Sequence, residues 1–277
     1  MKKQLFTMLM AASALAPAVA DDFKYTDEQF ADIQMLRYKV AGFDQLSLRQ
    51  KTLVYYLSEA ALQGRDILFD QNGRYNLRIR RLLEAVYTDY KGDRDSDFYR
   101  ALTVYLKRVW FSNGIHHHYG SEKFVPGFTE ADLRAAVRQL DPARLRLPEG
   151  QTVEAFCDEL FPVIFDPAVM PMRVNQRAGD DLVLTSAGNY YGPGVTQEEA
   201  EAFYTAKKDL SDPRPVMMGL NSRLVKQDGR LVERVWRSGG LYGQAIDRII
   251  ACLEKARPFA DTPEQAKVID KLIEYYR

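Results

Sequence analysis

Helix start signals recur along this 277-residue chain, and they constrain its fold more than any other feature. A threonine followed three residues later by an acid or an amide, the pattern of a capping box, occurs at Thr129, Thr196 and Thr262. Pro263 adds a proline at the first helical position of the last of these segments. Apolar residues at spacings of three and four follow each signal, so the pattern predicts a mostly helical protein.

The same periodicity predicts helices in most of the chain outside one central region. Ser47 is the expected cap of the second helix, Gly64 marks its end, and residues 70–73 (Asp-Gln-Asn-Gly) read as a turn. The expected helices cover residues 27–38, 47–63, 74–90, 97–111, 129–140, 153–165, 196–208, 242–255 and 262–277.

Residues 174–236 have a different pattern, which indicates a β component. Leu182-Val183-Leu184 is a short apolar run that resembles a strand. Residues 216–225 and 231–236 flank Gln227-Asp-Gly-Arg, and Asp-Gly between two apolar runs is typical of a β-hairpin.

The first twenty residues have the three parts of a secretory signal peptide. Lys2 and Lys3 precede an apolar segment at 5–16, and Ala18-Val-Ala20 fits the small-residue cleavage rule. We therefore expect cleavage after Ala20 and a periplasmic or secreted location.

Charge and cysteine content exclude several classes of function. Lysine plus arginine and aspartate plus glutamate number 38 each, so there is no electrostatic case for nucleic acid or for an anionic membrane as a partner once the leader is removed. The only cysteines are Cys157 and Cys252. An exported protein could pair them, although we favour two unpaired thiols buried on helix faces, and the lack of a CxxC motif argues against a thiolate zinc site.

The three histidines, His116, His117 and His118, are contiguous, which limits their use in catalysis. A zinc-peptidase helix needs histidines four residues apart, and this spacing is impossible here. In an extended segment, His116 and His118 would share a face and could chelate a metal weakly, with Glu122 as a third ligand. The alternative, which we favour, is a loop whose imidazoles form hydrogen bonds and packing contacts.

No other catalytic set is recognisable in the sequence. Neither cysteine and no serine lies in a nucleophile-elbow pattern, and any catalytic base would have to come from the same three histidines. The paired carboxylates read as solvated surface charges, and no glycine-rich phosphate loop is present. One further cluster, Asn189-Tyr190-Tyr191 before Gly192-Pro-Gly and a helix start, is either a structural turn and cap or a surface that packs on a ligand or another domain through exposed helix amides.

Four stretches of the sequence carry a resemblance to a known family. They are WFSNGIHHHYGSEKFVPGF (110–128), NYYGPGVTQEEAEAFY (189–204), GLNSRLVKQDGRLVERVW (219–236) and GGLYGQAIDRIIACLEKARPFA (239–260). These stretches resemble the dipeptidyl peptidase III family of zinc metallopeptidases, in its Bacteroides-type branch. The likeness extends in order over essentially the whole chain after the leader.

The resemblance implies a specific fold and activity. Members of the family have two lobes, bind peptides in the cleft between them, and release dipeptides from peptide N-termini. The second lobe carries zinc on a HExxGH helix and a downstream helix rich in glutamate. By this likeness, residues 21–277 form the N-terminal lobe, of the mostly helical α+β class with a small antiparallel or barrel-like β part. We expect helices over 21–170, mixed structure over 171–240 and helices over 241–277.

This chain contains no HExxGH, so the resemblance assigns it no catalytic residue and no zinc ligand. The family's substrate-gripping residues mostly lie beyond the position that matches Arg277, and the substrate-binding residues of this chain stay unknown. The final helix has no stop signal before Arg277, and we expect the architecture to continue beyond it.

Two classes of function therefore stay open. One is a catalytically incomplete lobe of a zinc exopeptidase, with zinc held by the full-length enzyme and peptide bound only when the second lobe is present. The other is a non-catalytic periplasmic module that binds peptides or a protein. The surface candidates for either function are Asn189, Tyr190, Tyr191, His116 and His118.

Overall fold

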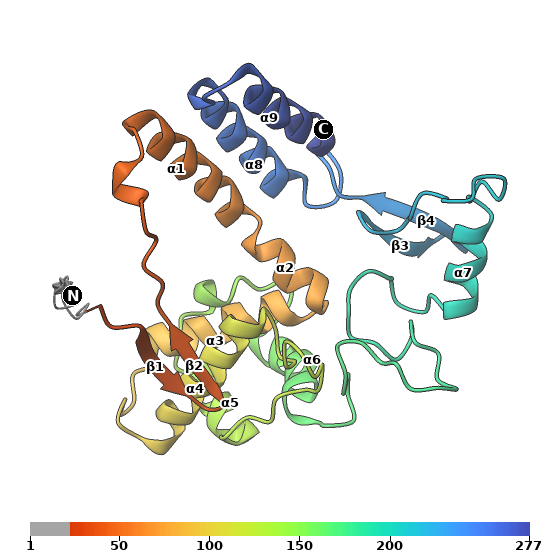
Figure 1. Ribbon diagram of the computed structural model, residues 1–277. Helices are drawn as coiled ribbons and strands as arrows, with labels where there is room; N and C mark the ends of the chain where they lie inside the picture. The colour runs from red at the N-terminus through yellow and green to blue at the C-terminus, as the bar shows by residue number, and fades with distance from the viewer. Residues whose placement is uncertain (1–22) are drawn as a thin grey trace, which may run out of the picture. The chain divides into compact units, whose positions relative to one another are not determined.

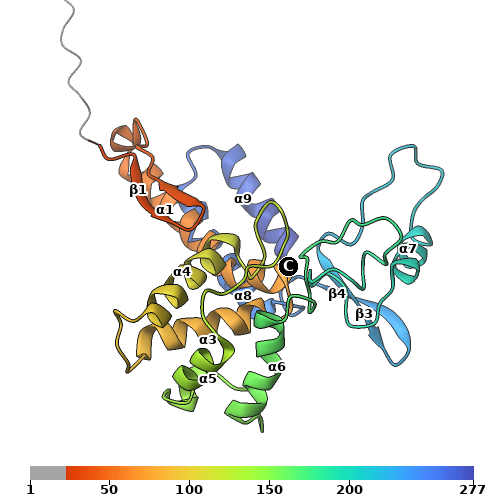
Figure 2. The ribbon, with the colours of Figure 1, turned by 90° about the horizontal axis from the view of Figure 1, so that it is seen from below.

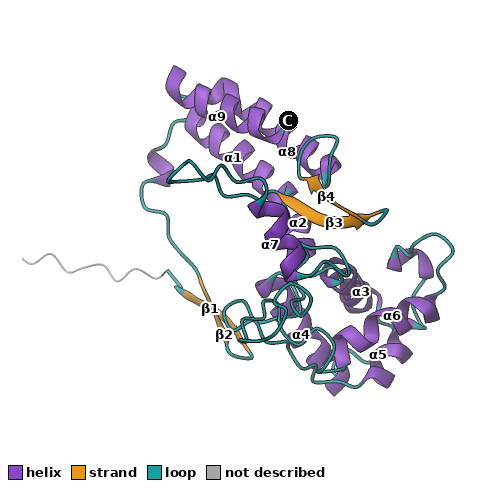
Figure 3. Ribbon diagram, turned by 90° about the vertical axis from the view of Figure 1, so that its right-hand side faces the viewer, coloured by secondary structure: helices purple, strands orange, loops and turns teal. Residues whose placement is uncertain are grey.

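A computed structural model describes residues 23–277, so the predicted signal peptide lies outside the described residues. The described chain divides into two compact units, one ending at Ala41 and one covering Gly42–Arg277, and each is described by itself. Helices predominate, and the strands form two separate antiparallel pairs (Figure 3). The mostly helical α+β class predicted from the sequence is confirmed.

The first unit is built around a β-hairpin, where the sequence predicts a helix over 27–38. Strands β1 (Thr26–Phe30) and β2 (Ile33–Leu36) pair antiparallel, with Phe30 opposite Ile33. The helix prediction is wrong because the apolar residues do not form one buried face: Ile33 is buried, whereas Leu36 is 54% exposed. The side-chain amide of Gln34 also donates to backbone carbonyls of the opposite strand, which stabilises the hairpin.

The second unit contains the remaining elements. Its α-helices are α1 (Leu48–Gln63), α2 (Arg65–Asn72), α3 (Asn76–Asp89), α4 (Asp97–Ser112), α5 (Glu130–Val137), α6 (Val153–Phe165), α7 (Gln197–Thr205), α8 (Gly243–Ala256) and α9 (Pro263–Tyr276). Its short 3-10 helices are η1 (Phe43–Gln45), η2 (Pro142–Leu145) and η3 (Arg257–Phe259), and its strands are β3 (Ser222–Gln227) and β4 (Arg230–Val235).

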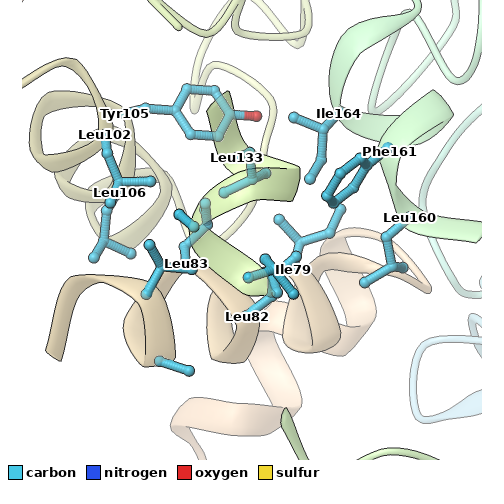
Figure 4. Packing of buried hydrophobic residues seen from close by; sticks show 14 of the residues in the cluster. Ile79, Leu82, Leu83, Leu102, Tyr105, Leu106, Leu133, Leu160, Phe161 and Ile164 are labelled. Carbon is cyan, nitrogen blue, oxygen red and sulfur yellow. The ribbon is translucent and has the colours of Figure 1, made fainter. Parts of the chain in front are cut away.

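Helices α3, α4, α5 and α6 surround the largest hydrophobic core (Figure 2). Their apolar residues recur at helical spacing, which places one face of each helix inward. Figure 4 shows how these side chains interdigitate between the helices. The fully buried residues among them include Ile79, Leu82, Leu83, Leu102, Leu106, Leu133, Leu160 and Phe161.

Helices α1, α8 and α9 form a second packing group, in which α8 contacts both of the others (Figure 1). Leu53 of α1 is buried against Ile246, Ile249 and Ile250 of α8, and Ile269 of α9 belongs to the same cluster. Apolar periodicity matches the buried face best in α8, where Ile246, Ile249, Ile250 and Leu253 are all buried.

The predicted hairpin around Asp228-Gly229 is confirmed as β3 and β4. Both turn residues have positive φ, 50° and 73°, as the common two-residue hairpin turn requires. A small apolar cluster of Val195, Ala200 and Leu224 lies between this hairpin and α7. Each sheet of the described chain has two strands and is open, so the β part is antiparallel but does not close into a barrel.

The strand predicted at Leu182-Val183-Leu184 is wrong. The carboxylate of Asp181 accepts hydrogen bonds from the backbone amides of Val183 and Leu184, over 3.0 and 2.9 Å, and holds the segment as a turn. The turn predicted at 70–73 is also misplaced, because Asp70, Gln71 and Asn72 are the last residues of α2 and only Gly73 follows it.

The helix start signals are mostly correct to the residue. Ser47 and Thr196 form reciprocal capping boxes, as does Thr129 with Asp132, and Thr262 caps α9. The ends of α5 and α7 come three residues earlier than expected, because boundaries are the least reliable part of a sequence prediction. Within residues 23–277, no helix combines the length and the apolar character that a membrane span requires.

Candidate functional site

A polar cluster that joins distant segments of the second unit is centred on Asp70, at the C-terminal end of α2. Its Oδ2 accepts a hydrogen bond from the Tyr242 hydroxyl over 2.5 Å and from the Arg223 guanidinium over 2.6 Å. The Asn189 side-chain amide donates to the same oxygen over 3.1 Å. One carboxylate oxygen thus receives three donors from three distant segments of the chain.

Arg223 links the other members of the Asp70 cluster to one another. Its Nε donates to the backbone carbonyl of Asn189 over 2.8 Å, and its Nη2 lies 2.9 Å from the Tyr242 hydroxyl. The backbone amide of Asn189 donates to the carbonyl of Gln71 on α2. Because β3 carries Arg223 and Tyr242 immediately precedes α8, the cluster joins α2, β3 and α8.

Burial and charge determine what the Asp70 cluster can do chemically. The side chains of Arg223 and Asp70 are 18% and 23% exposed, so their ion pair is largely shielded from water. Burial, reinforced by the hydrogen bond and the negative charge of Asp70, raises the pKa of Tyr242 well above its usual value. The phenol therefore stays protonated and acts as a fixed hydrogen-bond donor, which suits positioning rather than proton transfer at neutral pH.

Of the candidate residues, Asn189 belongs to this cluster, and Tyr190 and Tyr191 follow it in the chain. All three contact other residues of this chain. Asn189 is buried, and the Tyr190 ring lies 5.6 Å from the Trp236 ring. Tyr191 forms a parallel bridge with Leu224 of β3 and packs against the Val195 cluster. The contacts of Asn189 and Tyr191 are those of a structural turn, while Tyr190 keeps 39% of its surface exposed.

The amides at the start of α7 are already occupied by groups of this chain. The Gln197 amide donates to the carboxylate of Asp181, with a shortest distance of 3.0 Å. The Glu199 amide donates to Oγ1 of Thr196 over 3.1 Å. These two donors of the first turn are therefore not open to a ligand in this structure.

The histidine segment leads into a loop that contacts residues 170–172. His116 is 2% exposed, and its Nε2 donates to the carbonyl of Met170 over 2.8 Å. Burial lowers the pKa of His116 to about 4, so it is neutral at physiological pH. The His118 ring packs on Phe111 and Tyr119, at 4.9 and 4.4 Å between ring centroids.

Glu122 does not join His116 and His118 as the third ligand of the metal site considered above. Its carboxylate lies 3.9 Å from Nδ1 of His117, while its backbone carbonyl accepts from the His117 amide. Within residues 23–277, no three histidine, cysteine or acidic side chains are grouped so that they could hold a metal ion. The contacts of this loop match the hydrogen-bonding and packing role favoured from the sequence.

The two thiols lie in different hydrophobic clusters and are unpaired. Cys157 of α6 is buried, as expected, whereas Cys252 of α8 is only half-buried. Burial raises the pKa of the Cys157 thiol to about 11, so it carries almost no thiolate at neutral pH.

Sequence reasoning missed the three side chains that converge with Asn189, namely Asp70, Arg223 and Tyr242. Asp70 reads as a turn residue, and Arg223 reads as an ordinary polar residue of a hairpin. Tyr242 reads only as the start of a helix. The one available signal is indirect, because Arg223 and Tyr242 lie within the stretches that resemble the peptidase family.

Comparisons with known proteins find similarity among solved structures only. No family model matches the chain, and no protein with a curated description matches it. Among solved structures, the chain is similar to DPP III from Caldithrix abyssi, with 19% sequence identity and a TM-score of 0.49 over 84% of this chain. The match covers 32% of that protein, so this chain spans about a third of its length.

Proposed function

We propose that this chain is one lobe of a zinc-dependent, dipeptidyl peptidase III-like exopeptidase and supplies one wall of its peptide cleft. The zinc and its ligands belong to a second lobe, encoded either in the same gene or in a separate one. The predicted leader supports a periplasmic or extracellular location as part of this proposal. In the assembled enzyme, dipeptides would be released from the N-termini of peptides.

The observation that carries this proposal is the convergence of the family-like stretches on the Asp70 cluster. Residues 189–204 contribute Asn189, residues 219–236 contribute Arg223, and residues 239–260 contribute Tyr242. Three of the four stretches that resemble the family thus meet at one point of the structure, although residues 110–128 contribute no member of the cluster. Such convergence is what a shared lobe predicts.

The chemistry of peptide hydrolysis explains why we expect the isolated chain to be inactive. A zinc peptidase needs three protein ligands, a metal-activated water and a carboxylate base. The sequence has no HExxGH, and its three histidines are adjacent residues that cannot supply the usual ligand geometry.

The experiment has two parts, which separate activity from lineage. The purified chain with added zinc is assayed for hydrolysis of dipeptidyl-naphthylamides, and we expect no turnover above the rate with buffer. Robust zinc-dependent turnover would contradict the claim of catalytic incompleteness. Sequencing the gene past codon 277 and its neighbours tests the second lobe, for which we expect a frame that contains HExxGH.

A second candidate function, a non-catalytic module that binds peptides or a protein, is favoured by an exposed apolar segment before β3. Val216, Met217 and Leu220 are 74%, 74% and 69% exposed. Exposed apolar residues grouped in this way often mark contact surfaces. Calorimetry with short apolar peptides distinguishes the two functions, because a single wall of a cleft should bind them very weakly. Tight binding that is lost in Met217→Ser would favour the module.

A further inference from the structure

A hollow of about 650 Å³ lies on the helical part of the second unit, and no residue of the Asp70 cluster lines it. It is lined by residues of α2, α3 and α4 and by the segment that begins with η2. An adjoining hollow of about 450 Å³ shares Arg80, Glu84 and Trp110 with it. The volume is within the range of sites that bind small molecules.

Arginines dominate the charge of this double hollow. Its lining contains Arg65, Arg80, Arg81, Arg144 and Arg146 but only two acids, Asp66 and Glu84. This excess of positive charge creates a potential that attracts anions.

Three of the five arginines are held by acids of the chain. Arg80 and Arg81 contact the two oxygens of Asp66, at 2.7 and 3.1 Å, and Arg144 contacts Asp89 at 2.5 Å. Arg80 is only 9% exposed, and its guanidinium lies 4.5 Å from the centre of the Phe69 ring. These pairs fix the position of the positive groups that line the hollow.

The guanidinium groups of the other two arginines, Arg65 and Arg146, have no hydrogen bond or ion pair with any residue of the described chain. Both side chains are exposed. Arg65 is the first residue of α2, and Arg146 directly follows η2. Arg146 has a positive φ of 50°, a conformation uncommon for a residue other than glycine. Two guanidiniums without partners therefore remain available at a hollow that already has excess positive charge.

Trp110 supplies an aromatic surface within the same hollow. Its Nε1 donates to Oε1 of Glu84 over 2.8 Å, and the Tyr87 ring meets it edge-on at 6.0 Å. These contacts hold the indole while 38% of Trp110 stays exposed. A held and partly exposed indole is a suitable platform for a planar group.

We propose that this hollow binds a small planar anion whose ring packs on Trp110 and whose phosphate or carboxylate groups contact Arg65 and Arg146. Guanidinium groups recognise both kinds of oxyanion through paired hydrogen bonds. The aromatic platform explains why the ligand carries a flat ring and is not a bare inorganic ion. This site is independent of the proposed peptidase function.

The test uses Trp110 as the reporter. Trp236 is the only other tryptophan, and its buried Nε1 has no hydrogen-bond partner, so Trp236→Phe should leave the fold intact. In this background at low ionic strength, adenosine monophosphate and benzene-1,3,5-tricarboxylate are titrated while the emission of Trp110 is followed. We expect saturable quenching by at least one of them, and the tighter ligand identifies phosphate or carboxylate as the preferred group.

Charge variants test the specific contacts. Arg65→Gln and Arg146→Gln should each weaken binding about tenfold, because each removes a charged hydrogen-bond donor. Arg230→Gln removes an equal charge from the exposed end of the β3–β4 hairpin and should have no effect. The proposal is overturned if neither anion gives saturable quenching, or if all three variants weaken binding equally. If Trp236→Phe fails to fold, calorimetric titration of the two anions into the chain with Trp236 retained measures the same affinities.

Discussion

The hydroxyl of Tyr242 donates to Oδ2 of Asp70 over 2.5 Å, although 172 residues separate the two in the chain. The same oxygen accepts from Arg223 and Asn189, so a single carboxylate joins α2 to β3 and to the residue before α8. Loss of this oxygen would leave a shielded guanidinium and two other donors without their partner. The geometry of the proposed lobe therefore depends on Asp70.

Replacing Asp70 with alanine should lower the free energy of unfolding by about 2–3 kcal/mol, because the charge of Arg223 is left largely buried without its counter-ion. Tyr242→Phe should cost only about 1 kcal/mol, since Asp70 keeps two other donors. Urea unfolding followed by circular dichroism measures both values. Glu149→Ala, at an exposed acid with no partner among the described residues, is the control. Equal stability of the Asp70→Ala and Glu149→Ala variants would show that the cluster contributes nothing.

The sequence predicts local structure well wherever the signal is contained in one segment. The capping threonines and the apolar faces of α3, α4 and α8 are examples, because each depends on residues within about four positions of one another. The hairpin at Asp228-Gly229 is predicted for the same reason. Spacing failed at 27–38, where three apolar residues fit a helix but do not share a buried face.

The Asp70 cluster could not be predicted because its members meet only through the tertiary fold. Nothing in the spacing of Asp70, Asn189, Arg223 and Tyr242 links them. The turn at 182–184 shows a second limit: the side chain of Asp181 competes with strand formation by bonding the following amides, and the apolar run alone does not reveal this. The sequence marks Asn189 as a candidate surface residue, whereas in the structure it is a buried member of a network.

Gly192 makes a close approach that should not tolerate a side chain. A Cβ at this position would lie 3.0 Å from Cγ1 of Val225 and 3.2 Å from its Cα. Gly192→Ala should therefore push the Tyr191 segment away from β3 and destabilise the chain by about 1–3 kcal/mol. In Gly188→Ala the new Cβ meets its nearest atom at an ordinary 3.5 Å, so that variant should be nearly neutral. Thermal melts of the two variants give the comparison, and equal melting temperatures would refute the steric argument.

Lys123 should stabilise the C-terminal end of α6. Its ammonium donates to the carbonyls of Val163, Asp166 and Val169, the second at very short range. These acceptors include a last-turn carbonyl of a helix, where a positive charge is also favoured by the helix dipole. Lys123→Met should cost about 1–2 kcal/mol and increase hydrogen exchange at 163–170. Lys267→Met, on the exposed face of α9, removes the same charge as a control and should leave exchange in that segment unchanged.

The two thiols should differ in reactivity. Cys252 is half-buried, whereas Cys157 is buried and has a raised pKa, so iodoacetamide at neutral pH should modify Cys252 slowly and Cys157 only after unfolding. Peptide mapping by mass spectrometry identifies the modified residue. The two thiols lie in separate clusters, so no disulfide should join them. A peptide pair linked through Cys157 and Cys252 in the native, non-reduced protein would contradict this.

His116 should make the stability of the protein depend on pH. Its Nε2 is bonded to the Met170 carbonyl, and its buried Nδ1 has no partner in the described chain. The positive charges of Lys123 and Arg173 disfavour protonation, whereas the bond to Met170 and the charge of Glu122 favour it. Burial is the largest cause, and together these effects lower the pKa of His116 to about 4. The unfolded chain has an ordinary histidine pKa of about 6.5.

Below pH 6.5 the unfolded chain therefore binds a proton at His116 that the folded chain does not, and stability should fall as the pH drops from 6.5 towards 4. The folded state should lose about 2 kcal/mol between pH 7 and pH 5 through this group alone. Urea unfolding at both pH values, on the wild type and on His116→Gln, isolates the contribution, because glutamine can still donate to Met170 but does not titrate. A wild type and a His116→Gln variant with equal losses of stability on acidification would show that His116 takes up its proton in the folded protein as readily as in the unfolded chain.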